Sequence, residues 1–261
     1  MSGRPKLGVF KFASCDGCQV SILNLDEALF ALSQRVEIAY FLEATSHVDA
    51  GPYDVALVEG SITTAADVQR IARIRETSRT LVTIGACATS GGIQALRNTA
   101  DVEDWKRTVY PHPEWIEALA TSTPIADHVK VDAEIQGCPV NKAQVLRVVL
   151  RALLGATDDL PGASVCMECK RAGHPCVVIT KGTPCMGPVT RGGCGALCPG
   201  LGRDCYGCFG PSDDPSPEAL VDEWMRRGMS RRDAARRLRS ITGWRREFRE
   251  EADRLEGHRR G

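Results

Sequence analysis

The sequence predicts an α/β protein with a doubly wound, mostly parallel β-sheet, followed by a loop-rich cysteine segment and a helical C-terminal tail. Short apolar runs alternate with stretches of helical periodicity over residues 1–158, which is typical of such a sheet. The 261 residues are 43% hydrophobic, enough for a sizeable core. Eight of the twelve cysteines lie within residues 166–208. We therefore expect three domains, 1–158, 159–212 and 213–261.

Five apolar runs are predicted as strands. They are residues 7–12, 36–42, 55–59, 80–84 and 129–135. Three stretches have helical periodicity, and two of them begin at residues suited to capping a helix. They are residues 18–33, the stretch from the Thr64–Asp67 capping box to about Ser78, and the stretch that follows Asn141 and Gln144.

Two segments of this first part are predicted as irregular. The glycine-rich residues 85–92 follow the fourth strand, and their spacing matches neither common phosphate-binding glycine motif. Residues 98–123 carry Trp105 and Trp115 and form either a surface excursion or a partner-facing element. Both interpretations remain open.

Four cysteines follow predicted strands directly. Cys15 and Cys18 come after the first strand, Cys87 after the fourth and Cys138 after the fifth. In a parallel sheet the carboxyl ends of the strands share one edge, where ligands bind. The sequence therefore predicts a four-cysteine site at that edge.

The other eight cysteines open with C-M-E-C and close with C-Y-G-C, pairs whose spacing suits a common metal centre. They are Cys166, Cys169, Cys176, Cys185, Cys194, Cys198, Cys205 and Cys208. Six prolines and eleven glycines between Pro161 and Pro211 leave little room for helix or strand. We expect no ordinary apolar core in this segment, so disulfides or metal must hold it together.

The charge balance and the lack of apparent targeting signals bear on whether disulfides or metal hold the cysteine segment. Lys plus Arg equal Asp plus Glu at 33 each, which gives no basic excess for a nucleic-acid partner. No secretory or twin-arginine signal and no transmembrane segment is apparent, so we expect a cytoplasmic protein. Because the cytosol is reducing, thiolate ligation of metal is favoured over disulfides.

The tail from Ser216 to Arg254 is predicted as helices. Residues 225–261 hold thirteen arginines against six acids. Interspersed acids favour a solvated, ion-paired face, with a subunit docking surface and a nucleic-acid arm as alternatives.

Both zinc and iron-sulfur clusters accept four thiolates. Zinc ribbons use two knuckles on short hairpins, whereas the first quartet spans Cys15 to Cys138. Proline follows Cys138 and Cys198, as it follows ligands in ferredoxin-type motifs. Three iron-sulfur clusters in one chain would indicate electron transfer, and a zinc-stabilised scaffold without a redox role remains the alternative.

Several motifs resemble the small, electron-transferring subunit of nickel-iron hydrogenases. They are C-D-G-C at 15–18, V-E-G-S-I at 58–62, G-A-C-A-T-S-G-G at 85–92, G-C-P at 137–139 and C-G-A-L-C-P-G-L-G-R-D-C-Y-G-C-F-G-P at 194–211. The likeness is to the cytoplasmic group 3 type, such as sulfhydrogenase delta and F420-non-reducing hydrogenase small subunits. It implies a flavodoxin-like first domain.

The resemblance also implies three 4Fe-4S clusters. The proximal cluster would be bound by Cys15, Cys18, Cys87 and Cys138, the distal by Cys166, Cys169, Cys176 and Cys185, and the medial by Cys194, Cys198, Cys205 and Cys208. Cys166 stands where many relatives have histidine. No catalytic residue and no nickel would lie in this chain, because H2 conversion belongs to the large subunit of the family. Diaphorase-type iron-sulfur or flavin subunits that use NAD(P) would be further partners.

Glu59 and His174 are candidate site residues other than cysteine. Glu59, at the end of a predicted strand, is either a proton relay near the proximal site or an acid that caps a loop. His174 could be a ligand, although the cysteines already suffice.

Respiratory complex I subunits resemble the first domain, but they have adjacent cysteines where this chain has C-D-G-C and they lack the eight-cysteine extension.

Overall fold

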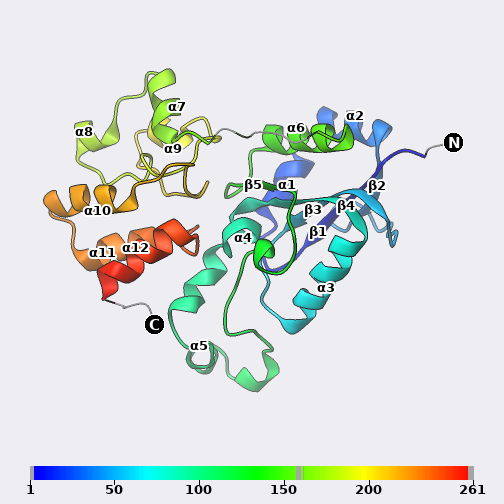
Figure 1. The fold of residues 1–261 in the computed structure, drawn as a ribbon, viewed down its shortest axis with the longest axis horizontal. Helices are drawn as coiled ribbons and strands as arrows, with labels where there is room; N and C mark the ends of the chain where they lie inside the picture. Colours follow the sequence, from blue (N-terminus) through cyan, green and yellow to red (C-terminus); the bar gives the residue numbers. More distant parts are fainter. Residues whose placement is uncertain (1–2, 157–159, 161, 258–261) are drawn as a thin grey trace. The chain divides into compact units, whose positions relative to one another are not determined.

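The computed structural model describes residues 3–156, 160 and 162–257 of the chain. The chain divides into two compact units, Met1–Asp159 and Leu160–Gly261 (Figure 1). Unit 1 is a five-stranded sheet with helices on both faces, and unit 2 consists of short helices and loops. Our prediction of three domains, at 1–158, 159–212 and 213–261, stays a prediction.

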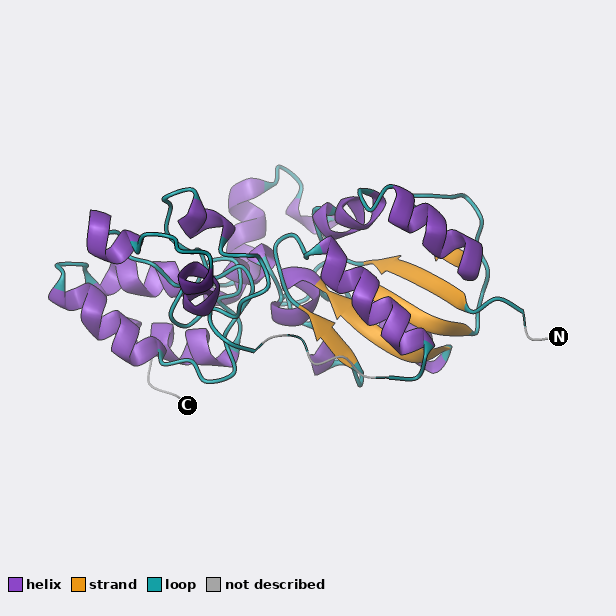
Figure 2. Cartoon of the chain, turned by 90° about the horizontal axis from the view of Figure 1, so that it is seen from above, coloured by secondary structure: helices purple, strands orange, loops and turns teal. Residues whose placement is uncertain are grey.

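All five predicted strands are present, and the predicted α/β fold with a parallel sheet is confirmed. The strands pair in parallel in the order β2-β1-β3-β4-β5, which is the flavodoxin-like order. Figure 2 shows their arrowheads pointing the same way. Their bounds are β1 Lys6–Lys11, β2 Glu37–Phe41, β3 Tyr53–Glu59, β4 Ser78–Ile84 and β5 Ala133–Ile135.

Helices cover both faces of this sheet. Helices α1, α2 and α6 lie on one face and α3 on the other (Figure 1). Consecutive strand residues point to opposite faces, and because both faces are covered, the consecutive residues Leu57 and Val58 are both buried. The helices are α1 Gly17–Leu23, α2 Glu27–Arg35, α3 Ala65–Glu76, α4 Gly85–Ser90, α5 Val102–Val109 and α6 Lys142–Leu153, with 3-10 helices η1 Ile93–Thr99, η2 Pro113–Trp115 and η3 Ile125–Asp127.

The predicted helix starts at Thr64 and Asn141 are confirmed. The Thr64 hydroxyl accepts the backbone N–H of Asp67, and the Asp67 carboxylate accepts that of Thr64, which completes the capping box. The Asn141 side chain accepts the backbone N–H of Ala143 and Gln144 at the start of α6.

Two local predictions were wrong. The single helix predicted over residues 18–33 is two helices, because Asp26 has the positive φ of 52° that a right-handed helix cannot contain. Residues 85–90 form helix α4 instead of a loop, and the helix ends at Gly91, whose φ is 74°. The glycine content of residues 85–92 had predicted a loop, whereas Gly91 only ends the helix.

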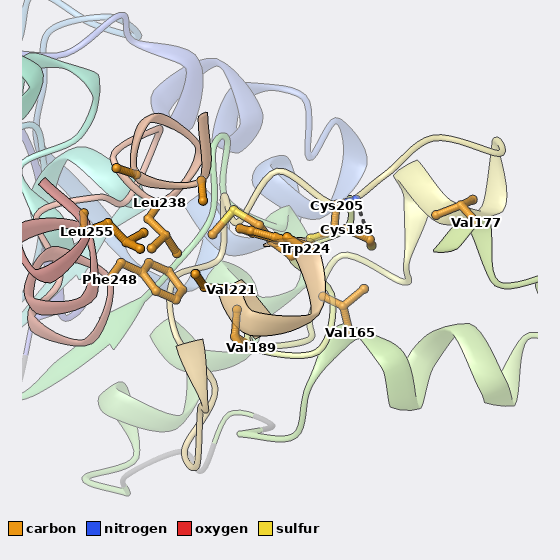
Figure 3. Packing of buried hydrophobic residues seen from close by; sticks show 14 of the residues in the cluster. Val165, Val177, Cys185, Val189, Cys205, Val221, Trp224, Leu238, Phe248 and Leu255 are labelled. Atoms are coloured by element: carbon orange, nitrogen blue, oxygen red, sulfur yellow. Dashed lines mark hydrogen bonds between the residues drawn. The ribbon is translucent and has the colours of Figure 1, made fainter. Parts of the chain in front are cut away.

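Unit 2 has an apolar core that the sequence did not predict. The cysteine-rich segment contains three short helices, and its Val165 and Val189 are buried in one cluster with Trp224 and Phe248 from the terminal helices (Figure 3). Our expectation that residues 161–211 have no ordinary apolar core was wrong, because residues 217–256 supply much of the apolar area. The helices are α7 Val165–Arg171, α8 Val177–Lys181, α9 Leu197–Gly200, α10 Pro217–Arg226, α11 Arg231–Leu238 and α12 Arg246–Glu256.

Many arginines of the terminal helices form ion pairs. Arg239, which directly follows α11, pairs with Asp253 and Glu256 of α12, and Arg254 pairs with Glu251. These pairs agree with the predicted ion-paired face. None of the described helices combines the length and the hydropathy that a bilayer-spanning segment requires.

The shared core predicts that damage in α12 reaches the cysteine segment. Phe248 is fully buried, so Phe248→Ala should lower the free energy of unfolding of unit 2 by about 3–5 kcal/mol. Hydrogen exchange should quicken at the amides of Val165 and Val189, which donate to the carbonyls of Thr190 and Met186.

The matched control is Arg246→Ala, on the same helix, whose side chain is 77% exposed and forms a surface ion pair with Glu250. Faster exchange confined to residues 217–256 in Phe248→Ala would contradict a shared core.

Candidate metal centres

The sheet brings the first four cysteines together. Cys15 follows β1, Cys18 lies in the first turn of α1, Cys87 lies in α4 directly after β4, and Cys138 follows β5. The negative charges of Cys87 and Cys138 both raise the pKa of the Cys18 thiol, and that of Cys15 raises the pKa of Cys87 and Cys138. The four sulfurs therefore share one electrostatic environment at the carboxyl edge of the sheet.

Two glycines leave space around these sulfurs. A Cβ at Gly85 would lie 2.4 Å from the Cys18 Sγ, and one at Gly92 would lie 2.6 Å from the Cys87 Sγ. Both glycines also have positive φ, 86° and 64°. Any other residue at either position would intrude on the thiol group, so the backbone forms a cradle into which a bulky prosthetic group fits.

Burial is the main cause that raises the pKa of these thiols. It raises the pKa of Cys87 to about 11, and it raises the pKa of Cys18 still further. Several thiolates in such a place need positive charge close by, and metal ions supply it. Four thiols at one edge of a sheet, of which Cys18 is buried and Cys15 and Cys138 are exposed, suit an iron-sulfur cluster as its donors.

Glu59 lies directly beneath this site. Its side chain is 2% exposed, and its carboxylate accepts the backbone N–H of Cys18 at 3.1 Å and that of Gln19 at 3.3 Å. Burial raises the pKa of Glu59, while these hydrogen bonds oppose the rise. The contacts show Glu59 capping α1 and supporting Cys18, and the proton relay stays a prediction.

Sequence reasoning missed Gln94, which joins three parts of the site. Its Nε2 donates to the Ala13 carbonyl at 2.7 Å, while its Oε1 lies 3.5 Å from the Cys87 Sγ. Gln94 thereby links η1 to the loop after β1 and to α4. A single glutamine in an irregular stretch carries no sequence signal for this role.

In unit 2, one group of thiols is held close together. Burial, followed by the charges of Cys185, Cys169 and Cys176, raises the pKa of Cys166 to about 11. A Cβ at Gly187 would lie 3.3 Å from the Cys185 Sγ and 3.5 Å from the Cys166 Sγ. These contacts are those expected of the quartet predicted for the distal cluster.

The remaining four cysteines of unit 2 do not form a group clearly separate from the first one. Cys205 and Cys208 interact electrostatically, and backbone N–H groups of Ala196 and Leu197 approach the Cys194 thiol. The backbone N–H of Cys205 donates to the Cys185 Sγ at 3.2 Å, which joins the two groups (Figure 3). The hydrogen bond with Tyr206 is the main cause that raises the pKa of Arg203, and the charge of Cys198 adds to it. The division of the eight cysteines therefore stays a prediction.

Glu168, between the cysteines of C-M-E-C, is a second residue that sequence reasoning missed. Its carboxylate accepts the backbone N–H of Gly193 at 2.7 Å and that of Ala196 at 3.1 Å. It thereby fastens α7 to the loop that carries Cys194. The His174 ring lies close to Gly200, the last residue of α9.

All twelve cysteines are free thiols. As the side chains stand, no group of three or more His, Cys, Asp or Glu within the described part of the chain is spaced to hold a single metal ion.

Comparison with known proteins finds relatives among hydrogenase subunits. Sulfhydrogenase 2 subunit delta of Pyrococcus furiosus is 36% identical over 239 residues, which cover 92% of this chain and all of that one. A subunit of the F420-non-reducing hydrogenase vhu of Methanococcus voltae is 32% identical, over 82% of this chain and 85% of that one. A chain of the crystal structure of an NAD+-reducing [NiFe]-hydrogenase in the H2-reduced state is 28% identical with a TM-score of 0.56, over 61% of this chain and 96% of that one.

The fold, the thiol sets and these matches define an oxidoreductase subunit of the hydrogenase small-subunit class, and the predicted resemblance is confirmed. Residues 15–152 match the family described as NADH ubiquinone oxidoreductase, 20 Kd subunit, and the chain belongs to this family. The matched range contains Cys15, Cys18, Cys87 and Cys138.

The cradle predicts that Gly85→Ala damages the first site alone. The new Cβ would overlap the Cys18 Sγ, so the purified protein should hold less iron per chain, by about the four atoms that one four-thiolate cluster contains. Colorimetric iron analysis after anaerobic purification measures this.

Gly155→Ala is the matched control. Gly155 has a similar φ of 71°, but a Cβ there would lie no closer than 3.8 Å to another described atom, the Arg79 Nη2. Wild-type iron content in Gly85→Ala would be evidence against the cradle.

Proposed function

We propose that this chain is the electron-transfer subunit of a nickel-iron hydrogenase, relaying electrons through three 4Fe-4S clusters. The observation that carries the proposal is the meeting of Cys15, Cys18, Cys87 and Cys138 at the carboxyl edge of the sheet. Eight further thiols in unit 2 are enough for two more clusters.

The chain's own residues hold and insulate these groups. Cys15, Cys18, Cys87 and Cys138 would bind the proximal cluster, Cys166, Cys169, Cys176 and Cys185 the distal, and Cys194, Cys198, Cys205 and Cys208 the medial. Each bound cluster would accept and release one electron at a time. Buried ligands such as Cys18, Cys185 and Cys205 would keep water from the sulfurs.

A protein partner near the first site is supported by exposed apolar side chains. Val20 on α1 is exposed two residues after Cys18, and Ile93 and Leu96 on η1 are exposed just after the Gly91–Gly92 turn. We infer that this surface binds the nickel-containing large subunit. Exposed Trp105 and Trp115 lie further along the same chain segment and favour the partner-facing interpretation of residues 98–123.

The downstream acceptor is inferred from the relatives. One solved structure that this chain resembles is that of an NAD+-reducing [NiFe]-hydrogenase. We infer a diaphorase-type iron-sulfur or flavin subunit that uses NAD(P) as the acceptor partner. We also infer a cytoplasmic location, where reduced thiols are available for metal.

Two other functions remain as outcomes of experiment. The matched family takes its description from a respiratory subunit, but the sulfhydrogenase relative aligns over 92% of the chain, including the cysteine extension. A zinc-stabilised scaffold would be colourless. Anaerobically purified protein should instead absorb broadly near ~400 nm and be bleached by dithionite.

We predict that Cys87→Ala removes one cluster only. Iron should fall by about four per chain while the absorption of the other sites persists. Ser90→Ala, in the same helix, is the control, since the Ser90 hydroxyl donates to the Ala86 carbonyl and touches no thiol in the described structure. An unchanged iron count in Cys87→Ala would refute the proximal assignment.

We also predict that the purified chain alone does not oxidise H2. Dye reduction under H2 should appear only when a nickel-containing subunit is added, because all twelve thiols of this chain are assigned to electron transfer. Hydrogen-dependent dye reduction by the iron-loaded, nickel-free chain would sink the proposal.

A further inference from the structure

Arg237, on α11, is a cation placed beside the cysteines of unit 2. Its side chain is only 21% exposed, and it pairs with Asp204, whose side chain is 14% exposed. Asp204 immediately precedes Cys205, and the Arg237 Nη2 also donates to the Cys205 carbonyl at 3.5 Å. The terminal helices thereby insert a charge into the segment that carries the thiols.

Two aromatic rings limit where this guanidinium can lie. Its central carbon is 5.9 Å from the ring centroid of Tyr206 and 5.8 Å from that of Trp224. Trp224 belongs to the same buried cluster as Cys185 and Cys205, and Figure 3 labels all three. Packing therefore fixes the cation close to these two residues.

Cys205 connects this cation to the Cys185 sulfur, because its carbonyl accepts from the Arg237 Nη2 at 3.5 Å and its backbone N–H donates to the Cys185 Sγ at 3.2 Å. Burial lowers the pKa of Arg237, and attraction to the Cys185 thiolate opposes that effect. The Arg237 Nε is buried and has no hydrogen-bond acceptor among the described residues. A buried donor of this kind is costly unless it is satisfied, and sulfur of an iron-sulfur group is an acceptor of the right chemistry.

We propose that Arg237 raises the reduction potential of the iron-sulfur site that contains Cys185. The inference rests on the proposed function. Reduction adds one electron and one negative charge to that site and forms no bond, so a nearby buried cation favours the reduced state. Asp204 opposes this effect by partly neutralising the cation.

The test is a redox titration followed by electron paramagnetic resonance, on the iron-loaded protein as purified with any bound subunits. In Arg237→Gln the equilibrium constant for reduction of one site should fall about tenfold, which is about 59 mV for a one-electron couple. Arg237→Lys should restore most of the loss because it keeps the charge. Arg236→Gln, on the same helix and 61% exposed, should titrate as wild type.

The partner residue supplies a test of sign. Asp204→Asn leaves the Arg237 charge uncompensated, so the same potential should rise, opposite to Arg237→Gln. A merely structural role would not give opposite shifts. If Arg237→Gln fails to retain iron, Asp204→Asn still decides the matter.

Three results would overturn the inference. They are wild-type potentials in iron-replete Arg237→Gln, a drop in Arg237→Lys as large as in Arg237→Gln, and an unchanged or lowered potential in Asp204→Asn. Wild-type protein without iron-sulfur absorption would instead refute the proposed function itself, so the two failures are distinguishable.

Discussion

Parallel pairing of the strands is the constraint on which the first thiol site depends. Because β1, β4 and β5 belong to one parallel sheet, their carboxyl ends emerge at one edge although they are far apart in the sequence. Cys15 and Cys138 lie in the loops after β1 and β5, Cys87 lies in helix α4 directly after β4, and α1 adds Cys18. An antiparallel strand in place of any of the three would send its cysteine to the opposite edge.

Placing four thiols at one edge, with Cys18 buried and Cys87 half-buried, creates an electrostatic conflict that shapes their surroundings. Burial raises the pKa of Cys18 and Cys87, and the acidic Glu59 beneath Cys18 raises that of Cys18 further. The backbone accommodates this by giving Glu59 two N–H donors and by leaving glycine at 85 and 92. Such an arrangement is costly for a thiol protein and favourable for one in which metal cations neutralise the sulfurs.

In unit 2, packed helices instead of a sheet surround the thiols. Its cysteine segment has short helices but no sheet in the described residues, so the apolar faces of α10, α11 and α12 pack against it and complete the core. The same packing carries Arg237 to Cys205 and Trp224 to Cys185, which makes the terminal helices part of the thiol environment. Glu168 then fastens α7 to the loop of Cys194 by backbone hydrogen bonds.

The sequence by itself determined the strands, the capped helices at Thr64 and Asn141, and the edge at which the first four cysteines meet. Each follows from local periodicity, capping chemistry and the rule that parallel strands share a carboxyl edge. Only the tertiary structure decided that Asp26 divides a helix, that residues 85–90 are helical, and that Gln94, Glu168 and Arg237 lie beside thiols. These depend on contacts between residues distant in sequence, where one residue's role is decided by a neighbour that periodicity does not reveal. The core of unit 2 is of the same kind, because neither the cysteine segment nor the terminal helices bury their apolar faces without the other.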